Sequence, residues 1–381
     1  MSYQNNEVKS NYIITPPDKS LIMVSIFIIV IGILSVFSAG SARAISEGEN
    51  PLFYFIRHIA WLIGGIGACA FITYKIDYKK LRFIAIPFAI FVLVLLFLTA
   101  YTPLGVTVNG ARRWLDIGYR FQPSEFAKLA VILCFADIFS KNVKLIDSSK
   151  YIHYIMFFLM LFLIIRQPNL SMTILLLATV CAIYFCAGGS LKLILTSAAT
   201  VVPLGLLFLL RGFQKQRILM WINPKADPLG AGYNIIQSLI AFAEGGFFGV
   251  GYGNSKQKLA WLPEGHTDFI FSVFAEEWGF IGCLFLIILF MLFIRRGFVI
   301  ASRTPDMFGK LVAFGITFSI GIQAFINMGV ASSFLPASGV PLPFVSYGGS
   351  SLFITMCMLG ILLNISRKKV QKIIPNEAFN G

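Results

Sequence analysis

LVAFGITFSIGIQAFINMGVASSFLPASGVPLPFVSYGGSSLFITMCMLGILLNIS, residues 311–366, runs for 56 positions without one charged side chain. A helix needs about 20 mostly apolar residues to cross the hydrocarbon core of a bilayer, so this stretch is too long for one span. Its middle, residues 336–351, is rich in Pro, Gly and Ser, which are typical of a loop. The stretch therefore predicts two membrane helices joined by a loop.

The composition of the whole chain agrees with a membrane location. Of the 381 residues, 57% are hydrophobic and only 13% are charged. Soluble domains usually carry about 25% charged residues. The 38 Phe against 17 Asp plus Glu could not all be hidden inside a water-soluble fold of this size. These numbers exclude a soluble enzyme, a disordered chain and a disulfide scaffold.

Other charge-free stretches predict further membrane helices. The expected fold is all-α and polytopic, with ten transmembrane helices, at residues 21–40, 54–73, 83–100, 123–139, 151–166, 171–187, 193–210, 270–294, 310–328 and 351–366. The fourth is the weakest because it contains Glu125, Lys128 and Asp137. The first is read as a signal anchor. The expected organisation is an N-terminal tail (1–19), a membrane domain (20–366) with a large loop (212–268) between the seventh and eighth helices, and a C-terminal tail (367–381).

Lys and Arg predict the orientation of these helices. If both termini are cytoplasmic, the cytoplasmic segments hold 18 of the 31 basic residues and 7 of the 17 acidic ones, a net charge of 18 − 7 = +11. This satisfies the positive-inside rule. The outer side holds 13 basic residues, ten of them within 112–128 and 211–258. A single cation of this kind usually snorkels to lipid headgroups. Clustered cations also suit an anionic ligand such as a pyrophosphate, and nothing indicates nucleic acid.

The Cys and His residues indicate no metal chemistry. The six Cys fall in predicted spans without a Cys-x-x-Cys motif, and the three His form no His-x-x-x-His pair. We therefore expect neither disulfides nor a thiolate site, and a zinc hydrolase is disfavoured.

The long loop at 212–268 is the expected functional region, because long loops in compact proteins are usually functional. Residues 232–246 predict an amphipathic helix. The Gly-rich stretch 245–255 is weak evidence for phosphate binding, since it also suits an irregular turn. Glu264, His266 and Asp268 follow, directly before an apolar helix. Spacing alone favours Asp268 as a helix N-cap, and the alternative is a general base at the membrane surface.

Five motifs along the chain carry a resemblance to a known family. PEGHTDFIF (263–271) resembles the PEAHTDFIF motif of the SEDS family of polytopic peptidoglycan glycosyltransferases, with Gly265 in place of Ala. NGARRWL (109–115), QPSEFAK (122–128), QPNLS (167–171) and PLPFVSYGGSS (341–351) are similar to further segments of that family, and the resemblance runs from about 20 to 370. GVGYGNSKQKL (249–259) resembles the division-type branch (FtsW-like) better than the elongation-type branch (RodA-like).

The resemblance implies polymerisation of lipid II into glycan strands at the outer face of the membrane. It assigns Asp268 as the general base, with His266 and Glu264 as rivals for that role. A pyrophosphate leaving group needs cations rather than a carboxylic acid. The candidate pyrophosphate contacts are Arg112, Arg113, Lys128, Lys256, Lys258, Ser350 and Ser351. Three of these have a structural alternative: Lys128 could pair with Glu125 at i,i+3, and Ser350 and Ser351 could simply form the start of a helix.

The same resemblance implies the surroundings of the enzyme. The substrates are lipid II and polyprenyl-linked glycan, and the partners are a class B penicillin-binding protein transpeptidase and other divisome membrane proteins, at the septum of a bacterial cytoplasmic membrane. No metal is certain, and a Mg²⁺ ion could bridge Asp268 and the pyrophosphate.

Two other classes of function remain open. A flippase or transporter of lipid-linked cell-wall precursors would place polar residues deep among the helices, and Glu276 and Glu277 are its best support. A scaffold that only recruits partners would make the 263–271 motif dispensable.

Overall fold

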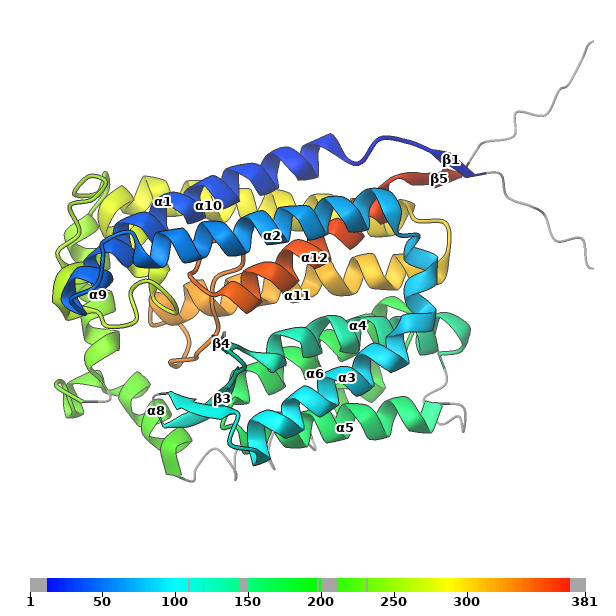
Figure 1. Ribbon diagram of the computed structural model, residues 1–381, viewed down its shortest axis with the longest axis horizontal. Helices are drawn as coiled ribbons and strands as arrows, with labels where there is room; N and C mark the ends of the chain where they lie inside the picture. Colours follow the sequence, from blue (N-terminus) through cyan, green and yellow to red (C-terminus); the bar gives the residue numbers. More distant parts are fainter. Residues whose placement is uncertain are drawn as a thin grey trace, which may run out of the picture.

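The computed structural model describes residues 12–108, 110–118, 120–143, 150–196, 199, 212–230 and 232–370. Long helices run along the longest axis of the molecule (Figure 1). The short strands β1 and β5 lie at one end of the bundle, here called the terminal end, and α8, α9 and β3 lie at the other, here called the loop end (Figure 1).

Among the described residues, nine helices stand where nine of the ten expected spans lie. They are α1 (Lys19–Ser46), α2 (Phe53–Lys75), α3 (Leu81–Tyr101), α4 (Pro123–Lys141), α5 (Tyr151–Arg166), α6 (Leu170–Cys186), α10 (Ile270–Arg303), α11 (Met307–Ala331) and α12 (Gly349–Ser366). The expected span at 193–210 lies outside the described residues, apart from 193–196 and 199. Six helices, α1, α2, α3, α10, α11 and α12, are long and apolar enough to cross a membrane. The chain is a mostly helical, multi-pass membrane protein.

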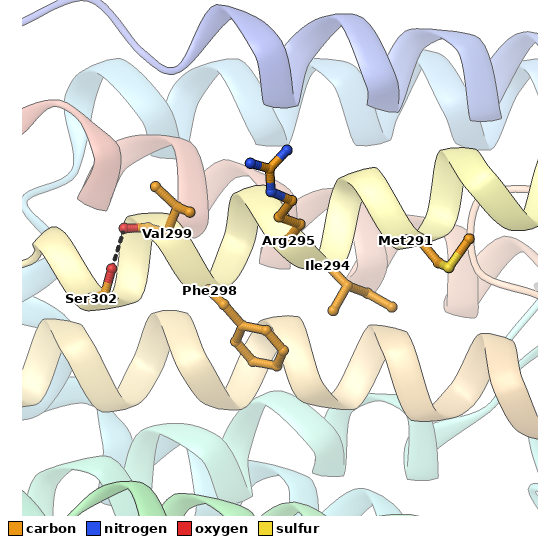
Figure 2. A pocket seen from close by; sticks show the side chains of 6 residues that line it. All are labelled: Met291, Ile294, Arg295, Phe298, Val299 and Ser302. Carbon is orange, nitrogen blue, oxygen red and sulfur yellow. Dashed lines mark hydrogen bonds between the residues drawn. The ribbon is translucent and has the colours of Figure 1, made fainter.

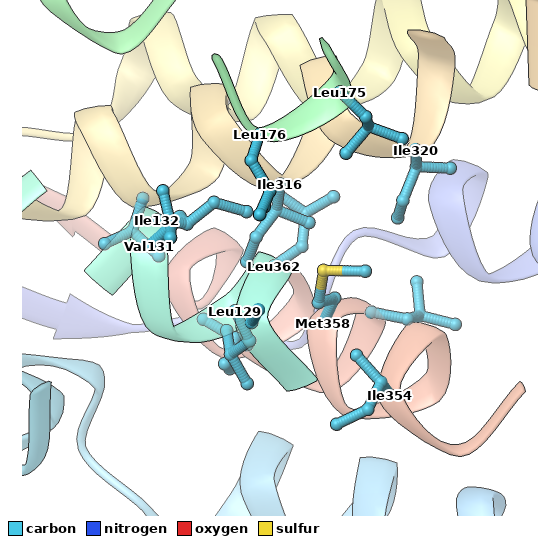
Figure 3. Packing of buried hydrophobic residues seen from close by; sticks show 14 of the residues in the cluster. Leu129, Val131, Ile132, Leu175, Leu176, Ile316, Ile320, Ile354, Met358 and Leu362 are labelled. Carbon is cyan, nitrogen blue, oxygen red and sulfur yellow. The ribbon is translucent and has the colours of Figure 1, made fainter. Parts of the chain in front are cut away.

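Helix α4 is the central helix of the bundle. Nearly all of its residues are buried, and α3, α6, α11 and α12 pack against it. Its apolar side chains meet those of α6, α11 and α12 in the core (Figure 3). A helix enclosed by protein need not be apolar throughout, which explains why α4 gives the weakest hydrophobic signal of the spans. Its charged side chains are paired: Glu125 with Lys128 at 2.7 Å and Asp137 with Arg82 at 2.7 Å.

Two small sheets correct the expectation of an all-α fold. At the loop end, β2 (Gly105–Val108), β3 (Ala111–Asp116) and β4 (Arg120–Phe121) form an antiparallel sheet in the order β2-β3-β4. The signal was present in the sequence, because Asn-Gly is the strongest short hairpin turn and Gly110 has a positive φ of 74°. At the terminal end, β1 (Tyr12–Ile14) pairs antiparallel with β5 (Lys368–Val370).

The long loop folds into short helices at the loop end. They are α8 (Gly212–Ile222), η3 (Pro224–Ala226), α9 (Tyr233–Gly245) and the π-helical turn η4 (Gln257–Trp261). The predicted amphipathic helix is confirmed as α9. Its buried face carries Ser238, Ala241 and Gly245, which are small enough for close packing. The Ser238 hydroxyl lies 2.6 Å from that of Ser272 in α10, so α9 lies against the bundle by its small, partly polar face.

Helix α10 is interrupted at Gly279, whose φ of 64° and ψ of −165° are not helical. The Gly-rich stretch fills this break. The N–H groups of Val250 and Gly251 donate to the carbonyls of Glu276 and Glu277 at 2.9 and 3.1 Å, and the Phe280 N–H donates to Gly246 at 3.0 Å. Irregular backbone at membrane depth is tolerated where protein satisfies its polar groups. These two N–H groups of the Gly-rich stretch are therefore committed to the break rather than to a phosphate.

Candidate functional site

The site forms where the loop before α10 meets the loop between α11 and α12. The Tyr347 N–H donates to the His266 carbonyl at 3.0 Å, and the Ser346 hydroxyl donates to the Thr267 carbonyl at 2.7 Å. Asn327 in α11 donates to the Asp268 carbonyl at 2.8 Å. The two motifs at 263–271 and 341–351 are thus joined by hydrogen bonds, although about 70 residues separate them in the sequence.

Asp268 does not cap α10. The helix begins at Ile270, its N-cap position is Phe269, and no side chain caps it there. The interpretation that spacing alone favoured is therefore wrong. The Asp268 carboxylate is left available for another role.

Two arginines approach Asp268 from other elements. Arg113 in β3 donates from Nε to the Gln167 carbonyl at 3.1 Å, and Arg217 in α8 donates from Nη1 to the Ala337 carbonyl at 3.3 Å. Gly339 lies between Arg113 and Asp268: a Cβ atom on it would stand 3.0 Å from Arg113 Nη1 and 3.5 Å from Asp268 Oδ2. A guanidinium and the carboxylate therefore line the same short piece of backbone.

Burial raises the pKa of Asp268 to about 7, with a further rise from Glu264. Arg113 and Arg217 act in the opposite direction, and Glu125 in α4 adds a smaller rise. Burial also lowers the pKa of Arg113 to about 10, assisted by the like charge of Arg217. The Arg113 guanidinium therefore stays cationic at neutral pH, while the carboxyl group of Asp268 titrates there; burial also lowers the pKa of Arg217.

His266 lies among aromatic rings. Its imidazole centroid is 4.9 Å from that of Tyr54 in α2 and 5.8 Å from that of Tyr347. Burial lowers the pKa of His266 to about 4. An unperturbed imidazole has a pKa near 6.5, so in this fold His266 is a weaker base than its residue type suggests. Glu264, the other rival, accepts a hydrogen bond from the Thr267 hydroxyl at 2.8 Å.

The neighbouring Arg112 and Arg113 on β3 contact different parts of the protein, because successive side chains of a strand point to opposite faces. Arg113 points to the loops around Asp268. Arg112 instead donates from Nε to the Gly105 carbonyl at 3.1 Å and from Nη2 to the Thr102 carbonyl just beyond α3. The structure places only one of the two residues beside Asp268.

The predicted lysines and serines are dispersed. Lys128 is fully buried and contacts both Glu125 and Gln323, so the structural alternative of an i,i+3 pair is confirmed for it. Lys256 is exposed beside η4. Ser350 accepts a hydrogen bond from the Gln122 N–H at 2.9 Å, and both Ser350 and Ser351 are buried at the start of α12.

Lys258 and the two glutamates of α10 form one buried cluster. Lys258 pairs with Glu277 at 2.8 Å. The Glu276 carboxylate accepts the N–H of Lys256 at 2.7 Å and the Ser255 hydroxyl. The carboxylates that best supported a transporter thus hold η4 against α10.

Two further features lie apart from Asp268. Among the described residues, no group of three or more His, Cys, Asp or Glu could hold a metal ion. A shallow hollow on α10 is lined by Met291, Ile294, Arg295, Phe298, Val299 and Ser302 (Figure 2). It begins 21 residues along α10 from Ile270, about 30 Å at helical rise, and belongs to a different part of the surface.

Comparison with known proteins identifies the family of this chain. The family model described as "Cell cycle protein", named for FtsW, RodA and SpoVE, matches residues 18–371. The chain belongs to this family. The "Probable peptidoglycan glycosyltransferase FtsW" of Trichlorobacter lovleyi is 38% identical over 92% of this chain and 93% of its own length. The "Peptidoglycan glycosyltransferase MrdB" of Escherichia coli is 40% identical over 75% of this chain and 79% of its own.

A solved structure has the same fold as this FtsW/RodA/SpoVE-family chain. It was described as "Structural coordination of polymerization and crosslinking by a peptidoglycan synthase complex". Its matching chain has a TM-score of 0.75 and 30% identity, over 92% of this chain and 98% of that one.

Three residues of this family member's site were not singled out from the sequence. Arg217 belongs to a basic cluster, and nothing in the sequence distinguishes it from its neighbours. Gly339 is one of several small residues in a loop. Asn327 does carry a signal, since it and Gln323 are amides at i,i+4 within the charge-free stretch 311–366.

Proposed function

We propose that this chain is a peptidoglycan glycosyltransferase that polymerises lipid II into glycan strands, with Asp268 as its general base. The observation that carries the proposal is the placement of a half-buried carboxyl group, with a pKa raised to about 7, opposite Arg113 across the Gly339 backbone and within the electrostatic influence of Arg217. A general base works best when its pKa lies near the working pH. The relatives named peptidoglycan glycosyltransferase supply the reaction class.

The residues present suit each demand of this reaction. The acceptor sugar hydroxyl attacks the anomeric carbon of the donor, a new C–O bond forms, and the bond to the polyprenyl pyrophosphate breaks. The Asp268 carboxylate takes the hydroxyl proton. Arg113 and Arg217 supply fixed positive charge for the leaving pyrophosphate, whose charge grows as the bond breaks. The guanidinium fork matches phosphate oxygens in geometry as well as in charge.

Asp268 suits the role of base better than His266. With a pKa near 4, the His266 imidazole is neutral at pH 7 but holds a proton weakly. It also packs against the rings of Tyr54 and Tyr347. We propose that the His266 ring packs the site. The negative charge of Glu264 adds to the effect of burial, which raises the pKa of Asp268.

The proposal includes the surroundings of the enzyme. Ten spans with both termini cytoplasmic would put the loop end, and with it Asp268, at the outer face of the cytoplasmic membrane, where 212–268 forms the loop between the seventh and eighth helices. A class B penicillin-binding protein is the proposed partner, since the matched chain comes from a complex of polymerisation and crosslinking. A division role at the septum follows the FtsW-like motif at 249–259.

The test is polymerisation of purified lipid II by the purified protein, alone and with its transpeptidase partner. Asp268→Asn keeps the size of the side chain and removes the base, so we expect the glycan product to be lost. Glu244→Gln, which removes an exposed acid from α9, is the matched control and should polymerise normally. A wild type that makes no polymer under either condition, or an Asp268→Asn protein that polymerises normally, would overturn the proposal. Flipping of lipid II in proteoliposomes by the same preparation would favour the transporter instead.

A further inference from the structure

Two amide side chains on α11 face the site from inside the bundle. Gln323 and Asn327 stand at i,i+4, so they lie on one face of the helix, and both are almost completely buried. Each donates to the loop between α11 and α12: Gln323 to the Pro341 carbonyl and Asn327 to the Val340 carbonyl, both at 2.8 Å. Burying amides is unfavourable unless they are hydrogen-bonded, so these bonds explain their presence in an apolar span.

Of these two amides, Asn327 is the one that contacts both halves of the site. Its Nδ2 group donates one hydrogen bond to the Asp268 carbonyl and one to the Val340 carbonyl, each at 2.8 Å. The residue before Val340 is Gly339, whose backbone lies against both Arg113 Nη1 and Asp268 Oδ2. A single rigid NH₂ group therefore sets the distance between two backbone segments. One carries the Asp268 carboxylate. The other, at Gly339, lies between that carboxylate and the Arg113 guanidinium.

The acceptor atom of the same amide is consistent with this interpretation. Asn327 Oδ1 is buried and has no hydrogen-bond partner among the described residues. Burying a polar atom without a partner is unfavourable. The amide thus supplies its two donors at the expense of an unsatisfied acceptor.

Gln323 anchors the other end of this arrangement. Its Oε1 accepts a hydrogen bond from Lys128 Nζ at 2.6 Å, and Lys128 pairs with Glu125 at 2.7 Å. The buried ion pair of α4 is in this way connected to Pro341, the residue next to Val340. The loop therefore has a fixed support on α4, against which the Asn327 bonds hold Asp268.

We propose that Asn327 is a positioning residue that holds the Asp268 carboxylate at its place beside Gly339 and the guanidinium of Arg113. This inference rests on the proposed function of Asp268. Asn327 itself acts only on backbone, at the carbonyls of Asp268 and Val340. A displacement of about 1 Å in a reacting group can lower a rate by a factor of about 100, so loss of these bonds should affect turnover more than substrate affinity.

The test measures lipid II polymerisation by full-length Asn327→Ala, Asn327→Ser and Asn327→Asp proteins. We expect kcat to fall by about tenfold or more in Asn327→Ala and by less in Asn327→Ser, which keeps one donor, with KM for lipid II changed by less than about threefold. Ser319→Ala is the matched control, because Ser319 lies two turns earlier on α11, is equally buried, and its hydroxyl has no hydrogen-bond partner among the described residues. It should keep the wild-type kcat.

A pH profile tests whether position 327 lies close enough to Asp268 to act on its titration. The charged groups that act on Asp268 are Glu264 on its own loop, Arg113 on β3, Arg217 on α8 and Glu125 on α4. Asn327→Asp adds a carboxylate beside them, so the acidic limb of the kcat profile should move up by about half a pH unit or more. A variant that merely lowered the amount of folded protein would leave that limb in place.

Three results decide the question. If the folded Asn327→Ala and Asn327→Ser proteins, verified by size-exclusion chromatography and thermal melting, keep the wild-type kcat and pH profile, the positioning role is wrong. If Asn327→Asp does not fold, the other two variants decide alone. Asp268→Asn is measured beside them: if it polymerises normally, the proposed function itself fails, whereas an inactive Asp268→Asn with normal Asn327 variants overturns this inference only.

Discussion

Lys258 and Glu277 form an ion pair, with Nζ 2.8 Å from Oε1, across the junction between η4 and α10. Both side chains are almost completely buried, and the Ser38 hydroxyl of α1 contacts both of them. The pair therefore ties α1, η4 and α10 together just before the segment that carries Asp268. Its position explains why a lysine predicted to contact substrate is better understood as part of the support for the site.

Breaking this pair should destabilise the protein more than removing it completely. Glu277→Leu or Lys258→Met alone leaves one buried charge unpaired, so we expect each to lower the free energy of unfolding by about 3–5 kcal/mol. The double variant should lose clearly less free energy of unfolding than the sum of the losses in the two single variants. Thermal unfolding in detergent measures the cycle, and Lys256→Met, which alters an exposed neighbour, should be close to neutral. Additive single effects would contradict the pairing.

A methyl group on Gly249 should disrupt the junction in α10. Gly249 has a φ of +83°, and its added Cβ would stand 2.2 Å from the Glu277 carbonyl oxygen, so Ala is opposed by both conformation and contact. We expect Gly249→Ala to lower the melting temperature and to expose the loop 246–255 to proteolysis. Gly64→Ala in α2 is the control. The Cβ atom that it adds would have no neighbouring atom within 4 Å, so the change should be neutral or slightly stabilising. Equal stability of the two variants would mean that the loop does not occupy the break.

The raised pKa of Asp268 predicts a pH-dependent effect on stability. The carboxyl group titrates near pH 7 in the folded state and near 3.9 in the unfolded chain. Its contribution to stability is therefore fully present below the unfolded pKa and is lost as the pH rises through about 7. Asp268→Asn cannot ionise, so its melting temperature at pH 8.5 should exceed that of the wild type by roughly 2 °C or more, and the difference should shrink at pH 5.5. A difference independent of pH would show that the Asp268 pKa is not raised.

Arg113 and Arg112 should respond differently to the same conservative change. The Arg113 guanidinium contacts the Gln167 carbonyl with one nitrogen and faces the site with another, and the single ammonium group of Lys cannot do both. Arg113→Lys should therefore raise KM for lipid II by about tenfold. Arg112→Lys loses hydrogen bonds to Gly105 and Thr102 instead, and should lower the melting temperature with KM unchanged. Kinetics and melting curves on the same preparations distinguish the two effects, and an equal rise of KM in both would contradict the strand alternation.

Much of the fold follows from local properties of the sequence. The membrane helices could be predicted because a run of about 20 apolar residues is required by the thickness of the bilayer, whatever surrounds the helix. α4 was the weakest of them since its position at the centre of the bundle, which allows Glu125 and Lys128, depends on the other helices. The sheet β2-β3-β4 was not predicted, although Asn-Gly is a typical hairpin turn, because its segment falls between the expected spans 83–100 and 123–139 and was read only as a connection between them.

The sequence by itself determined where the helices lie, which family the motifs resemble, and that Asp268 stands beside α10. Only the tertiary structure decided which charged side chains lie near the Asp268 carboxylate. Arg113 and Arg217 come from segments about 100 residues apart, and Lys128 and Lys258 turn instead to buried carboxylates of their own. Charge count and spacing are local, whereas the electrostatic environment of a carboxylate depends on distances across the fold. The pKa of about 7 for Asp268 is therefore a property of the assembled bundle and not of its motif.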